Sequence, residues 1–207
     1  TRKVSLPKMR RLLFSLLLIA CISMQPNVVQ AQQTQVAQSI PLKVNKIYKG
    51  KSIKVDDGDT FTFLSKSKTP YKIRLDGIDA PEKGMPYAKK AKEYLAALLL
   101  CQDIEIRIVS IDRYGRYIAK VSCAHKDLSL VMLEAGYAWH YKQYNQEASL
   151  ATAAEKARQQ QTGLWQEKAR LAPWTVRAYR RAGYSDLEFQ KLRKQNSPEI
   201  RRFIEAI

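Results

Sequence analysis

Between residues 43 and 75 the sequence crowds short β-rich runs together, separated by Gly, Asp and Pro residues. The runs cover residues 43–49, 52–55, 60–64 and 71–75. Runs this short, bounded this closely by turn residues, are typical of strands joined by tight turns. The sequence therefore predicts that the folded part of the chain begins as a tightly meandering β-sheet.

A helix and a hairpin follow this meander. Apolar residues recur at helical spacing over 86–100, and Pro86 suits the first turn of a helix. Apolar alternation over 104–109 and 117–121, around a turn at Asp112-Arg113-Tyr114-Gly115, predicts a β-hairpin. Further helices are expected over 127–135 and 146–161. The fold class is therefore mainly β with α: an OB-fold, meaning a five-stranded Greek-key barrel, with about three helices.

Cysteine usage favours a disulfide over a metal site. If residue 106 faces about residue 119 in the hairpin, Cys101 and Cys123 come close together, and we predict a bond between them. The cysteines and the two histidines lack the spacing of zinc ligands, which argues against a zinc site.

The first 31 residues look like a targeting segment. They hold basic residues and no acidic ones, and the apolar run 12–22 follows Met9-Arg10-Arg11. That run is shorter than the roughly 20 residues that span a bilayer. With Ala31 at the cleavage position, the pattern predicts a signal peptide and a secreted or periplasmic protein. An alternative is a lipoprotein anchored through Cys21, since Leu18-Ile19-Ala20-Cys21 resembles a lipoprotein box, and only then do we expect membrane contact.

The rest of the chain divides into three parts. Residues 32–42 are Gln-rich and read as a linker, 43–178 form the folded domain, and 179–207 form a basic tail with helical character. The whole chain carries a formal net charge of +17 and is 45% hydrophobic. Such a chain can build a core, and its charge points to a polyanionic partner, above all nucleic acid.

Acidic residues gather in two short segments of this basic chain. Asp57-Gly58-Asp59-Thr60 opens one predicted strand, and Asp76-Gly77-Ile78-Asp79-Ala80-Pro81-Glu82 follows another. Crowded carboxylates are unfavourable unless a cation offsets them. Two Asp side chains, a backbone carbonyl and water make an oxygen site suited to Ca²⁺.

Two arginines complete a hydrolytic set. Arg74 leads into the second acidic segment, and Arg116 follows the hairpin turn. Arginine suits phosphate oxygens, a metal offsets charge on a five-coordinate phosphate, and a spare carboxylate can accept a proton from water. No Ser/His/Asp or Cys/His pattern supports covalent catalysis, so the residues favour metal-assisted phosphodiester hydrolysis.

Taken with Gly136-Tyr137-Ala138-Trp139, Gly163-Leu164-Trp165 and Pro173-Trp174, these motifs resemble the staphylococcal nuclease (thermonuclease) family over residues 43–178. The resemblance implies an OB-fold and a Ca²⁺-dependent nuclease that acts on DNA and RNA and leaves 3′-phosphate ends. It also implies that Asp59, Asp79 and the Ala80 carbonyl hold Ca²⁺, with Asp57 as their support.

By the same resemblance, Glu82 acts as general base or orients the attacking water, and Arg74 and Arg116 bind the scissile phosphate. Arg113 keeps a cation beside the hairpin turn, and Tyr141 and Tyr144 lie near the positions of substrate-contacting tyrosines. We expect nucleic acid as substrate, a monomer and no stable protein partner. The rival interpretation is a non-catalytic OB-fold module that only binds nucleic acid.

Overall fold

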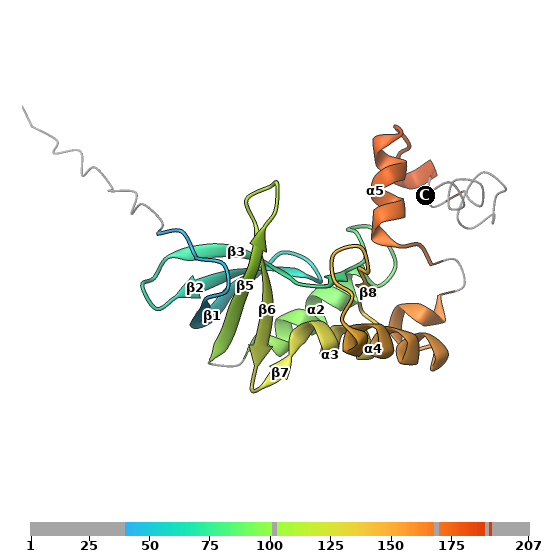
Figure 1. The fold of residues 1–207 in the computed structure, drawn as a ribbon. Helices are drawn as coiled ribbons and strands as arrows, with labels where there is room; N and C mark the ends of the chain where they lie inside the picture. The colour runs from blue at the N-terminus through green and yellow to red at the C-terminus, as the bar shows by residue number, and fades with distance from the viewer. Residues whose placement is uncertain (1–39, 101–102, 168–169, 189–190, 192–207) are drawn as a thin grey trace, which may run out of the picture. The chain divides into compact units, whose positions relative to one another are not determined.

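Five strands close into a barrel in the computed structural model (Figure 1). They are β1 (Ile47–Val55), β2 (Thr60–Ser65), β3 (Pro70–Leu75), β5 (Ile104–Ile111) and β6 (Tyr117–Cys123). The strands pair in the order β3-β2-β1-β5-β6, and each of these pairs is antiparallel. A parallel pairing of β3 with β6, through Ile73 and Tyr117, closes the ring. The predicted OB-type barrel is confirmed.

The structure describes residues 40–100, 103–167, 170–188 and 191. All of them belong to one unit, residues 38–207. The predicted signal peptide, most of the linker and the end of the tail lie outside the described residues, as do Cys21 and Cys101. In the part of the chain that is described, no helix has the length and apolar character needed to cross a membrane.

Shorter strands and the helices complete the fold. β4 (Ile78–Asp79) pairs with β8 (Trp139–His140), and β7 (Lys126–Asp127) extends the sheet beside β6. Figure 1 shows α2, α3 and α4 grouped beside the barrel. The helices are α2 (Ala88–Leu98), α3 (Leu128–Glu134), α4 (Ala148–Gln159), the 3-10 helix η1 (Gly163–Gln166) and α5 (Pro173–Arg181). Because α5 runs through position 178, one helix spans the boundary that we drew there from the sequence.

β1 is one strand where the sequence analysis placed two. The prediction of separate strands over 43–49 and 52–55 treated Gly50 as a break, and that was wrong. A Cβ at position 50 would lie 2.2 Å from the carbonyl oxygen of Leu64 and 2.6 Å from the Phe63 ring. Glycine is therefore required inside the strand, because the neighbouring strand approaches it too closely for a side chain.

The hairpin forms as predicted, but its register differs. Ile106 faces Val121 instead of residue 119, because the turn closes between Asp112 and Arg116 and is therefore centred on Tyr114. A bulge also shifts the pairing by one residue between Ile108 and Ser110. Such a bulge adds one residue to a strand and is invisible in an alternating pattern. Cys123 faces Ile104 and is disulfide-bonded. Its predicted partner, Cys101, lies outside the described residues.

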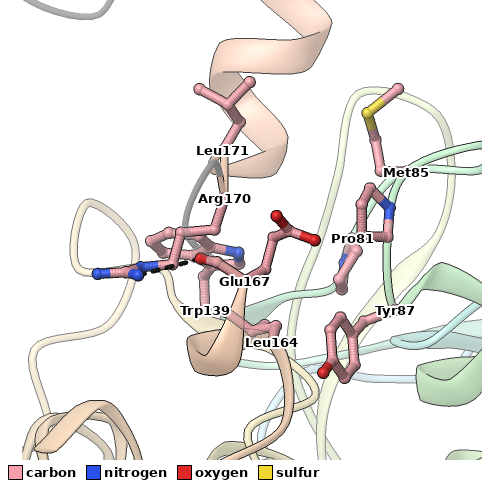
Figure 2. Close-up of a pocket in the computed structure, with 9 residues that line it drawn as sticks. Pro81, Met85, Tyr87, Trp139, Leu164, Glu167, Arg170 and Leu171 are labelled. Carbon is pink, nitrogen blue, oxygen red and sulfur yellow. Dashed lines mark hydrogen bonds between the residues drawn. The ribbon is translucent and has the colours of Figure 1, made fainter. Parts of the chain in front are cut away.

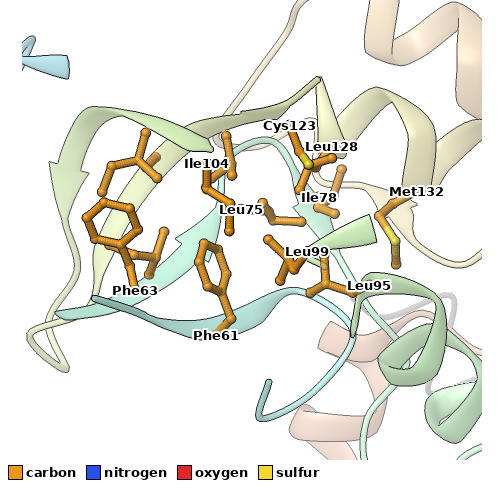
Figure 3. Close-up of a cluster of buried hydrophobic side chains, with 14 of the residues drawn as sticks. Phe61, Phe63, Leu75, Ile78, Leu95, Leu99, Ile104, Cys123, Leu128 and Met132 are labelled. Carbon is orange, nitrogen blue, oxygen red and sulfur yellow. The ribbon is translucent and has the colours of Figure 1, made fainter. Parts of the chain in front are cut away.

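One large apolar cluster fills the barrel and continues under the helices (Figure 3), and two small clusters lie apart from it, one at Met85, Val176 and Tyr179 and one at Ala157, Leu164 and Trp165. Phe61 and Phe63 point inward from β2, while Leu95 of α2 and Met132 of α3 reach the large cluster. Burying an aliphatic or aromatic side chain of this kind contributes about 1.5–3 kcal/mol. The core therefore fixes β2, β3 and β4, and the acidic residues lie on these strands or next to their ends.

Candidate active site

Two buried carboxylates form the centre of the site. Asp59 immediately precedes β2 and is 2% exposed, while Asp79 ends β4 and is 1% exposed. The segments come together closely because position 58 is glycine: a Cβ there would lie 2.7 Å from the Cβ of Ala80. The backbone N–H of Ala80 donates to Asp59 Oδ2 over 2.7 Å. The two acidic segments of the sequence are thus adjacent in space.

Arg74 bridges these carboxylates. It lies on β3 opposite Thr60, and its Nη1 is 2.5 Å from Asp59 Oδ1 while its Nη2 is 2.6 Å from Asp79 Oδ1. Burial lowers the pKa of Arg74, but the charges of Asp59 and Asp79 outweigh it and raise that pKa above its ordinary value. Buried carboxylates need such a partner. Arg74 therefore forms ion pairs with both aspartates, next to which the sequence analysis placed it.

Asp57 adds negative charge next to this pair. Its Oδ1 accepts the backbone N–H of Asp59 over 3.0 Å. Burial, together with the negative charge of Asp59, raises the pKa of Asp57 to about 6. The aspartates thus repel one another, and a further cation would relieve that repulsion.

The donor set at this point fits a hard cation. Asp59 and Asp79 offer carboxylate oxygens, and the adjoining Ala80 has a backbone carbonyl, which are the oxygen donors that Ca²⁺ prefers. Among the described residues no group of three or more His, Cys, Asp or Glu side chains could hold a metal ion. An ion here would therefore depend on two carboxylates, a carbonyl and water.

Glu82 faces two arginines that the sequence analysis did not single out. Arg177 Nη1 lies 2.6 Å from Glu82 Oε1, and Arg177 Nη2 lies 2.6 Å from Asp79 Oδ2. Arg180 Nη1 is 3.2 Å from the second oxygen of Glu82. Both arginines project from α5, so the C-terminal helix supplies two cations to the acidic site.

Arg116 is positioned by Asp112 at the base of the β5–β6 turn. Its Nε donates to Asp112 Oδ2 over 2.7 Å, and in the described part of the chain it makes no ion pair with the acidic site. Residues 73 and 117 pair in parallel. Extending that register by one residue puts Arg116 on the same face of the sheet as Arg74. The exposed Arg113 Nη2 donates to the hydroxyl of Tyr114 over 2.8 Å at the tip of the same turn.

The two predicted tyrosines differ in their surroundings. Tyr141 stacks on Trp174 with ring centroids 5.3 Å apart and planes 10° apart. Burial and the nearby charge of Asp79 raise the pKa of Tyr141. Tyr144 is 71% exposed and meets Tyr141 edge-on, with centroids 4.8 Å apart. Tyr141 therefore borders the acidic site, and Tyr144 lies further out.

A small cavity lies beside the segment that carries Glu82. Figure 2 shows Pro81 and Tyr87 on one side of it and Trp139, Leu164 and Leu171 on the other. Its volume of about 20 Å³ is enough for roughly one water molecule. The cavity separates the acidic segment from η1 and is too small for a substrate.

The sequence of this chain is similar to those of known nucleases. A family model described as staphylococcal nuclease homologue matches residues 72–167. Over 113 residues the chain is 39% identical to the staphylococcal-like nuclease CAN1 of Arabidopsis thaliana, covering 55% of this chain but only 35% of that protein. The chain thus spans about a third of the length of the plant relatives that it matches.

Bacterial relatives are covered more completely. An uncharacterized endonuclease of Haemophilus influenzae is 36% identical over 121 residues, which span 58% of this chain and 68% of that protein. An uncharacterized endonuclease of Escherichia coli O157:H7 is 34% identical over 129 residues, which span 62% of this chain and 84% of that protein. With the barrel and the matched segment, this similarity shows that the chain belongs to the staphylococcal nuclease family.

Proposed function

We propose that the chain is a calcium-dependent nuclease that hydrolyses phosphodiester bonds of DNA, RNA or both and leaves 3′-phosphate ends. The observation that carries the proposal is the buried pair Asp59 and Asp79, bridged by Arg74, with Glu82 linked to the same pair through Arg177. Buried acids this close to one another are costly, and sites that do chemistry are where such arrangements are found.

Each side chain has a distinct task in this proposal. Asp59, Asp79 and the carbonyl of Ala80 would hold Ca²⁺, which when bound supplies positive charge next to the phosphate. Glu82 is partly exposed and accepts the proton of the attacking water or orients it. Arg116, and Arg74 once freed from the acids, donate to phosphate oxygens and stabilise the charge that develops on them.

Release of acid-soluble nucleotides from DNA and RNA tests the activity, with Ca²⁺ or with a chelator. We expect release only with Ca²⁺, and end analysis should find phosphate at the 3′ side. Glu82→Gln should lower kcat by about 10²–10⁴-fold because it removes the proton acceptor. Glu134→Gln, which changes an exposed glutamate on α3, is the matched control and should keep wild-type turnover.

The alternative is a module that binds nucleic acid without cutting it. Binding of DNA measured by anisotropy, with no release of nucleotides in Ca²⁺, would establish that alternative. A Glu82→Gln variant with undiminished turnover would remove the proposed role of that residue while leaving the nuclease itself in place.

We also propose that the protein is exported, as a secreted or periplasmic protein. The proposal is supported by the signal-like segment 1–31 and by the disulfide at Cys123, since structural disulfides persist in oxidising compartments. Mass spectrometry of protein from the exporting cell should find an N-terminus after Ala31. A lipid-modified Cys21 would establish the anchored form instead.

A further inference from the structure

A groove of about 670 Å³ lies between β8, α4, η1 and α5, next to the acidic site. Its volume is in the range of ligand-binding clefts. It adjoins the site directly, because Trp139 of the groove pairs with Asp79 across β8 and β4. The backbone N–H of Tyr141, another lining residue, donates to the carbonyl of Gly77 over 2.9 Å.

Aromatic rings form a continuous surface in this groove. Trp174 lies parallel to Tyr141, with centroids 5.3 Å apart, and meets Trp139 edge-on at 5.9 Å. Trp139 also meets Trp165 edge-on at 4.6 Å. Trp139, Tyr141 and Trp174 are all half-buried, so part of each ring remains accessible. Accessible aromatic faces are what unpaired nucleobases stack on.

The charge of the groove is positive. Lys142, Arg158 and Arg181 line it and are exposed. Glu155 is the only acidic residue among the described lining residues, and Arg158 holds it through two hydrogen bonds of 2.8 and 2.7 Å. Glu155 thus offsets Arg158, and Lys142 and Arg181 leave the lining with a net positive charge. Aromatic rings flanked by net positive charge match a nucleic acid strand, which presents bases and phosphates together.

α5 gives different faces to the groove and to the acidic site. Trp174, Ala178 and Arg181 follow one another at helical spacing and line the groove. Arg177 and Arg180 lie on the adjoining face and contact Asp79 and Glu82. A strand bound in the groove would therefore enter the acidic site along the same helix.

We propose that this groove binds unpaired nucleotides of the substrate strand beyond the bond that is cut, with Trp174 and Arg181 as its main contacts. The inference rests on the proposed nuclease function for its meaning, but binding in the groove requires neither Ca²⁺ nor turnover. α5 lies outside the segment that the family model matches, residues 72–167. The groove is thus partly built from a part of this chain that the family match does not cover.

Intrinsic fluorescence tests binding directly, because the chain has three tryptophans and all three line the groove. Full-length protein in EDTA is titrated with an oligothymidylate of about twelve nucleotides, an abasic strand of equal length, and polyglutamate. We expect quenching by oligothymidylate, weaker quenching by the abasic strand, and none by polyglutamate. Equal responses to all three would overturn the proposal, and a response to polyglutamate alone would point to an acidic protein partner.

Variants separate the groove from the catalytic site. Arg181→Glu and Trp174→Ala should weaken oligothymidylate binding about tenfold, whereas Arg107→Glu, an exposed cation on β5, should not. With Ca²⁺, Arg181→Glu should lower kcat/KM about tenfold for hydrolysis of the twelve-nucleotide strand. The kcat/KM for a trinucleotide should not change, because a strand that short does not reach the groove.

The two proposals fail in different ways. If oligothymidylate quenches the fluorescence but the protein does not hydrolyse nucleic acid, the groove proposal stands and the nuclease proposal is wrong. If the protein hydrolyses nucleic acid but oligothymidylate does not quench its fluorescence, the groove proposal is wrong and the nuclease proposal stands. The same holds if Arg181→Glu and Arg107→Glu lose equal amounts of kcat/KM on long and short strands. Circular dichroism of each variant excludes unfolding as the cause.

Discussion

At the scale of single residues, Asp112 shows how a side chain outside the acidic site can position one that is expected to act there. Its Oδ1 accepts backbone N–H groups of Tyr114 and Arg116 over 2.9 and 3.0 Å, and its Oδ2 accepts from the Arg116 guanidinium. Burial raises the pKa of Asp112, but these donors outweigh it and leave the pKa below its ordinary value. Asp112 therefore fixes both the turn and the direction of Arg116.

Asp112→Asn should lower the free energy of unfolding at pH 7 by about 1 kcal/mol, because charge-assisted hydrogen bonds are lost. A carboxyl whose pKa is lowered on folding stabilises the protein above its unfolded-state pKa, near 4, and loses that effect as the pH falls. The difference in unfolding free energy between wild type and variant should therefore be smaller at pH 3 than at pH 7. Urea unfolding at both pH values measures it, and an equal deficit at both would contradict the electrostatic explanation.

Local motifs predicted that several acidic residues would lie close together. Asp59, Asp79 and Glu82 stand in two short segments at the ends of predicted strands. In the structure these three residues lie close together, linked by Arg74 and Arg177. The pairing of Arg116 with Asp112 was not predicted, although the residues are only four apart. Sequence shows that such a pair can form, but the surrounding turn decides whether it does.

At the scale of elements, a glycine pair controls how the end of α3 meets η1. Gly136 and Gly163 both have positive φ, and a Cβ on Gly163 would lie 2.3 Å from the Gly136 carbonyl oxygen and 2.6 Å from that of Ala135. These oxygens belong to the backbone, so they cannot move aside cheaply. The two elements touch through bare backbone, which holds Leu164 beside the small cavity and Trp165 in the wall of the groove.

Gly163→Ala should therefore destabilise the protein by at least about 4 kcal/mol, through strain and collision together. Gly115→Ala is the matched control, since Gly115 also has positive φ but a Cβ there would meet nothing within 4 Å. Only the strain remains in that variant, at about 1–2 kcal/mol. Thermal unfolding of both variants measures the difference, and equal losses would show that the close approach is unimportant.

Elements were predictable where their signals are local. Asp127 was expected to cap a helix, and its side chain does accept the N–H of Leu130 over 3.1 Å at the start of α3. The unbroken strand β1 and the bulge in β5 were not expected. Both depend on the neighbouring strand. Gly50 is required because β2 approaches it too closely for a side chain, and a bulge leaves the alternation of apolar residues unchanged.

At the scale of the whole molecule, α5 joins the end of the described chain to its acidic centre. The contact between Arg177 and Asp79 spans 98 positions in the sequence. Spacing alone puts Arg177 and Arg180 on one side of a helix, but nothing local says what that side faces. Part of the basic charge of the chain, which has a net charge of +17 overall, is thus used within the fold.

Because Arg177 contacts Asp79 as well as Glu82, it should compete with the proposed calcium ion for the carboxylate oxygens of Asp79. Arg177→Ala should tighten calcium binding about tenfold in isothermal titration calorimetry, since a positive charge next to the ion is removed. Arg177→Lys keeps the charge but loses the two-pronged contact of the guanidinium group. The calcium affinity of this variant should lie between those of the wild type and Arg177→Ala. Arg181→Ala, which removes a cation from the groove face of the same helix, should leave calcium affinity near that of the wild type. Weaker calcium binding in Arg177→Ala, with the fold intact by circular dichroism, would instead mean that Arg177 holds Asp79 in the position from which it binds the ion.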